Sequence, residues 1–273
     1  MKSETAFSMI PLPQRQAKPR DRGITMMIDW GLPIGLQTEV VETAGHYIDM
    51  AKIAGPIAGL MPKQVVEEKL SIFRAAEIST SQGGLFAELA FKQGNIEHFF
   101  GEVRSLGFSA VEISDNLLDW SLQEKQKTIR CAVEDFGLKV LGEVGKKEGA
   151  MNDNEVLADL DACFEAGASV VFLEAYELFA GDEIRDELIG KIAKQYPGER
   201  IIYELPVVIL PGITREFKHK VAAWLVREFG TEVNLANVEW DELWLLEAVR
   251  RGAAGETSHP QGAYQLAGFK PEG

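Results

Sequence analysis

The sequence predicts the α/β class: a single (β/α)8 TIM barrel with a short N-terminal arm. Short apolar runs with the length of buried strands alternate along the chain with amphipathic stretches of helical period. Near-continuous apolar strands are typical of a parallel sheet that helices cover on its outer face. Eight such units fill most of the 273 residues, close to the roughly 250 residues usual for this barrel.

Each predicted strand is an apolar run at regular spacing from the last. In chain order they are GITMMID (23–29), YIDMAKI (47–53), AAEISTS (75–81), AVEISD (110–115), KVLGEVG (139–145), SVVFLEA (169–175), RIIYELP (200–206) and EVNLANV (232–238). A doubly wound open sheet would need a glycine-rich phosphate turn after its first strand, and IDWGLPIG (28–35) does not have that pattern.

The predicted helices fill the gaps between the strands, and several end at a glycine, a common C-terminal stop. The clearest are PKQVVEEKLSIFRA (62–75), IEHFFGEVRSLG (96–107), LQEKQKTIRCAVEDFG (122–137), NEVLADLDACFEAG (154–167), TREFKHKVAAWLVREFG (214–230) and DELWLLEAVRRG (241–252). Because no linker or composition shift interrupts this pattern, we expect one domain. Its predicted parts are an arm at 1–22, the barrel at 23–257 and a tail at 258–273.

The charge balance restricts the partners. With 28 basic and 42 acidic residues the net charge is −14, which argues against nucleic acid or an anionic membrane surface and leaves a small-molecule substrate. No segment approaches the roughly 18 apolar residues of a spanning helix, and the N-terminus lacks a signal-peptide core, so we expect a cytoplasmic protein. Cys131 and Cys163 fall in predicted helices, which favours free thiols over a disulfide.

Ionisable side chains stand at the end of nearly every predicted strand. In a barrel of this kind the carboxyl ends of the strands surround the active site. Any single carboxylate there could be a helix cap or a loop salt bridge, but charged groups that share one cavity need partners or a metal. The set comprises Asp29, Lys52, Glu88, Glu112, Asp115, Glu143, Lys147, Glu174 and Glu204, together with the neutral amide of Asn237.

Carboxylates gathered without a Cys or His cluster favour a hard cation, and Mg²⁺ is the default expectation. A lysine among them can donate a proton or stabilise an enolate. The four histidines are scattered, and G-x-S-x-G, the motif of a serine nucleophile elbow, does not occur. The sequence therefore predicts metal-assisted chemistry on a small molecule.

At these residues the chain resembles the phosphosulfolactate synthase family of coenzyme M biosynthesis, which belongs to sulfonate metabolism. The matching segments run in order over roughly residues 18–257. They are KPRDRGITMMID, AGHYIDMAKI, QGGLFAE, VEISD, EVGKK, LEA, YELP, EVNLANV and EAVRRG. The resemblance implies a (β/α)8 lyase that uses Mg²⁺ to add sulfite to phosphoenolpyruvate, and it is compatible with a homo-oligomer.

With this resemblance, roles can be assigned to the candidate residues. We expect Lys52, Glu112, Glu143 and Lys147 to be catalytic, with Lys147 as a proton donor. Metal ligation is assigned to Asp29, Glu88, Glu174 and Glu204. Substrate binding is assigned to Lys18, Arg20, Tyr176 and Asn237.

The chain departs from the family where an anion would be held. The family's Gly-Trp-Gly-Thr-Ser after the second strand is replaced by residues 54–58, and Tyr176 and Leu85 replace an arginine and a threonine. Ile57, Leu85, Tyr176 and Leu178 would give a more apolar pocket. Two alternatives to phosphosulfolactate synthesis therefore stay open. One is related chemistry on a less anionic, non-phosphorylated substrate, and the other is a non-catalytic, stress-related barrel.

Overall fold

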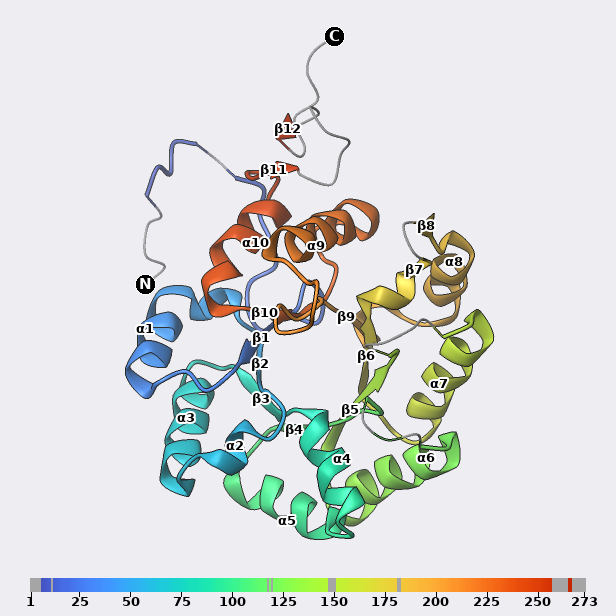
Figure 1. Cartoon of the computed structure of the whole chain (residues 1–273). Coiled ribbons are helices and arrows are strands. Elements are labelled where there is room, and N and C mark those ends of the chain that lie inside the picture. Colours follow the sequence, from blue (N-terminus) through green and yellow to red (C-terminus); the bar gives the residue numbers. More distant parts are fainter. Residues whose placement is uncertain are drawn as a thin grey trace.

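Eight parallel strands close into a barrel, as the sequence predicts (Figure 1). The computed structural model describes residues 6–10, 12–116, 118, 120–146, 151–180, 183–256 and 265–266. Around the barrel the strand order is β1-β10-β9-β6-β5-β4-β3-β2. The strands are β1 (Thr25–Asp29), β2 (Met50–Ile53), β3 (Ser79–Gln82), β4 (Ala110–Ile113), β5 (Lys139–Val144), β6 (Val170–Glu174), β9 (Ile201–Glu204) and β10 (Leu235–Val238). Each strand falls inside its predicted range and is shorter than it, except that β3 begins four residues late and runs one residue beyond, to Gln82.

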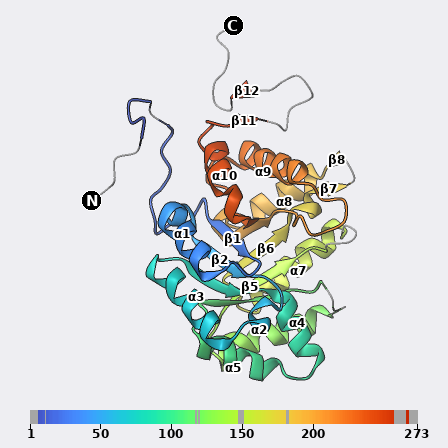
Figure 2. The ribbon, with the colours of Figure 1, turned by 60° about the vertical axis from the view of Figure 1, so that its left-hand side comes forward.

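Helices form a ring outside the strands (Figures 1 and 2). They are α1 (Ile34–Ala44), α2 (Ile57–Leu60), α3 (Lys63–Ala75), α4 (Gly84–Lys92), α5 (Ile96–Leu106), α6 (Leu122–Arg130), α7 (Asp153–Glu165), α8 (Asp186–Gln195), α9 (Arg215–Phe229) and α10 (Leu243–Arg250). A π-helical segment, η2 (Cys131–Asp135), continues α6, and the 3₁₀ turns are η1 (Gly45–Tyr47), η3 (Ala175–Leu178), η4 (Gly198–Arg200) and η5 (Trp240–Glu242). Two short antiparallel pairs join β7 (Phe179–Ala180) to β8 (Glu183–Ile184) and β11 (Gly255–Glu256) to β12 (Gln265–Leu266).

Local sequence signals fix where several helices begin and end. Ser121 and Glu124 form a reciprocal capping box at the start of α6, and Asn152 and Glu155 form another at the start of α7. Helix α5 ends at Gly107, whose φ of 89° is a left-handed conformation that glycine adopts without a steric penalty. The two capping boxes place the starts of α6 and α7 after β4 and β5, whose carboxyl ends carry Glu112 and Glu143.

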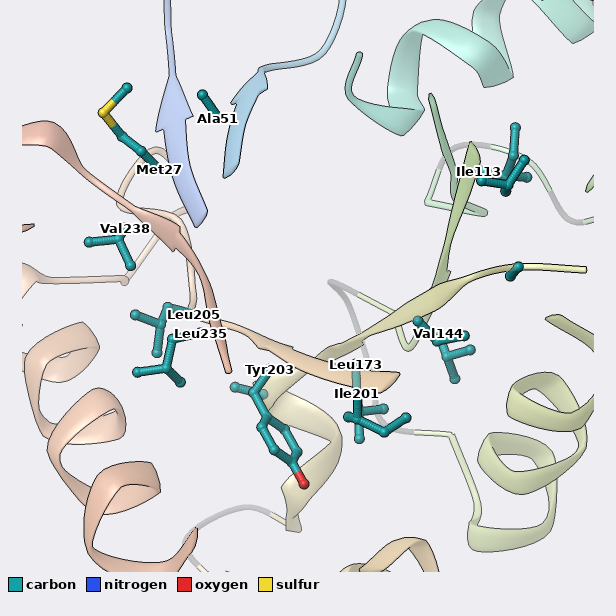
Figure 3. Close-up of a cluster of buried hydrophobic side chains, with 14 of the residues drawn as sticks. Met27, Ala51, Ile113, Val144, Leu173, Ile201, Tyr203, Leu205, Leu235 and Val238 are labelled. Carbon is teal, nitrogen blue, oxygen red and sulfur yellow. The ribbon is translucent and has the colours of Figure 1, made fainter. Parts of the chain in front are cut away.

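One face of each strand packs against the helices. Figure 3 shows such side chains on β1, β5, β6, β9 and β10, including Met27, Val144, Leu173, Tyr203 and Leu235. They belong to one large buried apolar cluster between the barrel wall and the helix layer. Both cysteines are free thiols, as expected, and Cys163 lies in this cluster.

The other face of each strand points into the barrel, because successive side chains alternate between the two faces. A separate cluster of buried apolar residues fills the lower interior: Met26, Met50, Ala110, Leu141, Phe172, Ile202 and Ala236. Two residues further along their strands, and therefore facing the same interior, stand Lys52, Glu112, Glu143, Glu174 and Glu204. The apolar floor thus supports a charged layer at the carboxyl ends of the strands.

No helix in the described parts of the chain has the length and apolar character needed to cross a membrane.

Candidate active site

Lys52 is the centre of the charged layer. From β2 its Nζ lies 3.0 Å from Glu112 Oε2 on β4 and also bonds to Glu204 Oε1 on β9. Its ammonium stands 5.1 Å from the ring centroid of Phe172, one layer below. Only 5% of Lys52 is exposed. The barrel therefore buries an amine and holds it between carboxylates that arrive from both sides.

Three carboxylates of this layer form a group that can hold a metal ion. Glu112, Glu143 and Glu204 each offer one oxygen, and these atoms lie within 4.8 Å of one another. Glu204 Oε2 is buried and accepts no hydrogen bond from the described residues. Three carboxylates against one ammonium leave two excess negative charges when all are ionised, which a divalent cation would balance. The donor set of carboxylate oxygens suits a hard cation such as Mg²⁺.

The pKa of Glu112 records this crowding of charge. Burial raises it, the ammonium of Lys52 lowers it, and Glu143 and Glu204 raise it further, to about 8. Its Oε1 also accepts a hydrogen bond of 2.9 Å from the backbone N–H of Gly84 at the start of α4. Without a bound cation, Glu112 holds a proton near neutral pH.

Gly84 allows that contact because it has no side chain. A Cβ at this position would lie 2.6 Å from Ser114 Cβ and 3.1 Å from Glu112 Oε1. Helix α4 can therefore begin directly against the end of β4 only with glycine here. In the sequence, Gly84 stands in the family segment QGGLFAE, but this packing reason is visible only in the fold.

Glu143 is positioned by two residues that the sequence analysis did not single out. Asn116 Nδ2 donates a hydrogen bond of 2.6 Å to Glu143 Oε1. Lys125 on α6 donates from Nζ to the backbone carbonyl of Glu143 at 2.6 Å and pairs with Asp159 at 2.8 Å. Lys125 is 1% exposed. In the sequence, a lysine on the apolar face of a predicted helix was the available signal.

Glu174 and Tyr176 lie beside the cluster. Glu174 ends β6 with its side chain on the interior face and is 2% exposed, but its oxygens are not part of the three-carboxylate group. Burial raises the pKa of Tyr176, and the neighbouring Glu174 raises it further. Leu178, expected to line a pocket with Tyr176, is instead fully buried in the core between barrel and helices.

Asp29 and Glu88, which the sequence analysis assigned to the metal, are held elsewhere. Asp29 lies two residues after Met27 on β1, so its side chain is on the same face of the strand and points outward, toward the helices. Its Oδ2 pairs with the buried Lys69 of α3 at 2.9 Å, and its Oδ1 accepts from the N–H groups of Gly31 and Leu32. Its carboxylate stabilises the loop after β1 and the contact with α3.

Glu88 on α4 accepts hydrogen bonds from the backbone N–H groups of Asn116 and Leu118, both at 3.0 Å. It thereby orders the loop after β4, which carries the Asn116 side chain to Glu143. The structure does not bring Glu88 into the three-carboxylate group.

Lys18 and Arg20 lie at the opposite rim of the barrel. Lys18 Nζ donates to the carbonyls of Gly45 and Ala76, which precede β2 and β3. Arg20 pairs with Asp49, also before β2, at 2.9 Å. These contacts fasten the N-terminal arm to the amino ends of the strands, away from Lys52. Lys147 lies outside the described residues.

Asn237 sits at an irregularity of β10. Thr25 pairs with Leu235 but Met27 pairs with Val238, so β10 carries one extra residue, and Asn237 has a φ of 60°. Asparagine tolerates this left-handed conformation better than most residues. Its Nδ2 donates to Leu205 O, while its buried Oδ1 accepts no hydrogen bond from the described residues. The bulge thus holds an amide at the barrel mouth.

Comparisons with known proteins identify the family of the chain. The family model described as "(2R)-phospho-3-sulfolactate synthase (ComA)" matches residues 13–256. The phosphosulfolactate synthase of Methanothermobacter thermautotrophicus is 31% identical over 256 residues, covering 90% of this chain and 95% of that protein. The Bacillus subtilis phosphosulfolactate synthase is 28% identical, with coverage of 91% and 97%.

More distant proteins extend the comparison. The Arabidopsis thaliana Protein HEAT-STRESS-ASSOCIATED 32 is 22% identical, covering 86% of this chain and 88% of that protein. Among solved structures, a dihydrodipicolinate synthase of Agrobacterium tumefaciens superposes with a TM-score of 0.55 at 9% identity, covering 84% and 75% of the two chains. That likeness shows the shared barrel fold. From the family match and the 31% relative together, the chain belongs to the (2R)-phospho-3-sulfolactate synthase family.

Proposed function

We propose that the chain is a phosphosulfolactate synthase-like lyase that adds sulfite to an enolate-type substrate such as phosphoenolpyruvate. The observation that carries the proposal is Lys52 held between Glu112 and Glu204 inside the barrel mouth, beside Glu143, in a member of that family. Four buried ionisable groups on four strands do not arise from packing needs alone, since each unpaired buried charge is costly.

The proposed reaction forms one carbon–sulfur bond and consumes one proton. The sulfur lone pair of sulfite attacks the methylene carbon of the substrate. The electron pair of the double bond moves onto the adjacent carbon and its carboxylate, giving an enediolate, and a proton then adds to that carbon. Mg²⁺ held by Glu112, Glu143 and Glu204 would supply positive charge to the substrate carboxylate and the developing enediolate.

The chain's own residues supply charge, orientation and the proton. Lys52 places an ammonium beside the same carboxylates, where low solvent exposure strengthens its field on bound anionic oxygens. Asn116 orients Glu143 through its hydrogen bond. We assign proton donation to Lys147, which follows Glu143 by four residues in the sequence.

A second candidate is the same addition on a less anionic acceptor. It is favoured by an apolar cluster near the mouth, in which Ile28, Ala54 and Val207 pack with Ile57 and Leu210. Tyr176 also stands where the family carries an arginine. A phosphate group gains less from such surroundings than from arginines and backbone amides.

The experiment is a ³¹P NMR assay of phosphoenolpyruvate with Mg²⁺, with and without sulfite. A new phosphate-ester resonance that requires both sulfite and Mg²⁺ supports the first candidate. Sulfite addition to fumarate, followed by ¹H NMR, with phosphoenolpyruvate untouched, supports the second. Sulfite-independent loss of phosphoenolpyruvate, or no turnover of either acceptor, contradicts both.

A further inference from the structure

A cavity of about 330 Å³ lies outside the barrel wall, on the side away from the acidic mouth. It is bounded by the last turns of α8, the first residues of β9, the end of α9 and the segment before β10. Its apolar surface includes Ile192, Ile201, Phe229 and Val233. Nothing in the proposed reaction uses this space. Its volume is at the lower end of the range for small-molecule sites.

Tyr203 points into this cavity with an unsatisfied hydroxyl. The residue is 8% exposed, and its hydroxyl takes part in no hydrogen bond within the described part of the chain. Figure 3 shows the Tyr203 hydroxyl directed away from the barrel wall, toward the helix layer. Burial alone raises the pKa of this phenol, so it stays a neutral donor. The hydroxyl is therefore open to a partner that occupies the cavity.

Two other polar side chains of the cavity are already engaged. Tyr196 donates its hydroxyl hydrogen bond to Asp161 at 2.8 Å. Asn234 donates to Gly198 O and Ile201 O and accepts from Ile24 N. Among the described groups lining the cavity, the Tyr203 hydroxyl is therefore the uncharged donor left for a ligand.

The shape and charge of the cavity define the ligand class. The ring of Phe229 stacks on that of Tyr203 with centroids 4.9 Å apart, which gives a flat aromatic wall. At the rim, Arg22 lies 3.7 Å from Glu199, and Glu232 adds a second carboxylate. Glu232 in turn lies 3.8 Å from Arg15, so both of these arginines are already paired with carboxylates and the rim offers little to an anion.

We propose that this cavity is a binding site for a neutral, flat aromatic molecule of about ten to fifteen non-hydrogen atoms that carries a hydrogen-bond acceptor for Tyr203. The site lies directly behind the charged cluster, because Tyr203 faces outward on β9 where the next residue, Glu204, faces inward to Lys52. It is independent of the proposed reaction.

The test uses two probes that differ by one acceptor, 1-indanone and indane. The full-length protein is labelled with 3-fluorotyrosine, and its ¹⁹F resonances are assigned by Tyr203→Phe, Tyr196→Phe and Tyr47→Phe. Titration with 1-indanone is expected to shift the Tyr203 and Tyr196 resonances and to leave that of Tyr47, near η1, unchanged. Equal shifts at all three, or none at Tyr203, would overturn the proposal.

Two variants distinguish the contribution of the hydrogen bond to affinity from that of the cavity volume. Tyr203→Phe is expected to weaken 1-indanone about fivefold, the value of one hydrogen bond, and to leave indane affinity unchanged. Ala193→Trp, which adds bulk to the cavity wall on α8, is expected to weaken both probes while the melting temperature is retained. If both variants bind both probes as the parent does, the cavity is not the site.

Discussion

Lys52 on β2 and Glu204 on β9, 152 residues apart in the sequence, form an ion pair inside the barrel. Their strands are not neighbours: β1 and β10 lie between them on one side of the barrel. The pair therefore closes across the interior, and Glu112 joins it from the other side at 3.0 Å. This contact draws three distant strands into one polar centre.

The ion pair predicts strong coupling in stability. Lys52→Met leaves two carboxylates without their ammonium and is expected to cost roughly 3–5 kcal/mol in metal-free buffer. Glu204→Gln should cost less, because Lys52 keeps Glu112. The double variant is expected to be more stable than the sum of the two single changes predicts, by at least about 1 kcal/mol. Urea unfolding of the four proteins measures this; strict additivity would show that the pair is not coupled.

Mg²⁺ is expected to stabilise the protein through the three-carboxylate group. At one hundred times its dissociation constant, a ligand that binds only the native state adds about 2.7 kcal/mol. For a chain of this size that corresponds to a rise in melting temperature of roughly 5–10 °C. Glu112→Gln and Glu204→Gln should reduce the rise sharply.

Asp29→Asn is the matched control for that experiment. It removes a buried carboxylate that pairs with Lys69 on the outer face of β1. It should lower the melting temperature yet preserve the response to Mg²⁺. An Asp29→Asn protein that no longer responds would place the metal at Asp29, as the sequence alone suggested.

Asp115 predicts a pH dependence of stability. Burial raises its pKa to about 6, although Lys125 opposes this, while Asp159, Glu143 and Glu88 add to the rise. Because the folded-state pKa exceeds the unfolded value of 3.8, the protonated form favours folding. The stabilisation is full below about pH 4 and is lost as the pH rises through about 6.

Asp115→Asn should remove that slope. The measurement is the free energy of unfolding between pH 4 and 7, in buffer without divalent cations. The parent protein should lose stability relative to Asp115→Asn across this range. Parallel curves for the two proteins would contradict the assignment.

Two helical glycines should respond oppositely to alanine. At Gly84 a Cβ would meet Ser114 Cβ at 2.6 Å, so Gly84→Ala is expected to cost roughly 1–3 kcal/mol and to disturb the Glu112 contact. Within α8, a Cβ at Gly190 meets none of the described atoms within 4 Å. Gly190→Ala should stabilise by roughly 0.5–1 kcal/mol. Thermal unfolding decides; a neutral Gly84→Ala would mean that α4 can move away from β4.

The barrel could be predicted because most of its strands can be recognised from short stretches of the sequence. Most strands are short apolar runs, and helical period and glycine stops separate the runs. β3, whose sequence is STSQ, is an exception, because it begins at the polar end of its predicted run. The residues of the charged layer could also be predicted from the sequence, because Lys52, Glu112, Glu143 and Glu204 stand near the ends of predicted strands. Position near a strand end does not say which face of the strand a side chain occupies. Ile28 faces the barrel interior, so the next residue, Asp29, faces the helices.

The remaining site residues depend on contacts that the sequence does not encode locally. Lys18 and Arg20 match the family's segment, yet they bind carbonyls and a carboxylate that precede β2 and β3, because the arm approaches the barrel from its amino-terminal rim. Asn116 and Lys125 orient Glu143 only once β4, α6 and β5 have packed together. In each case the contact depends on how distant segments pack together, and not on the local sequence pattern.

The most direct test of the account compares two lysines in one assay. Lys52 lies in the acidic centre, and Lys18 holds the arm at the opposite rim. With Mg²⁺, sulfite and the acceptor that the parent protein turns over, Lys52→Met is expected to lower kcat at least about 100-fold, while Lys18→Met keeps kcat and KM within about threefold. Full activity in a folded Lys52→Met protein, or loss confined to Lys18→Met, would contradict a catalytic centre at the carboxyl ends of the strands.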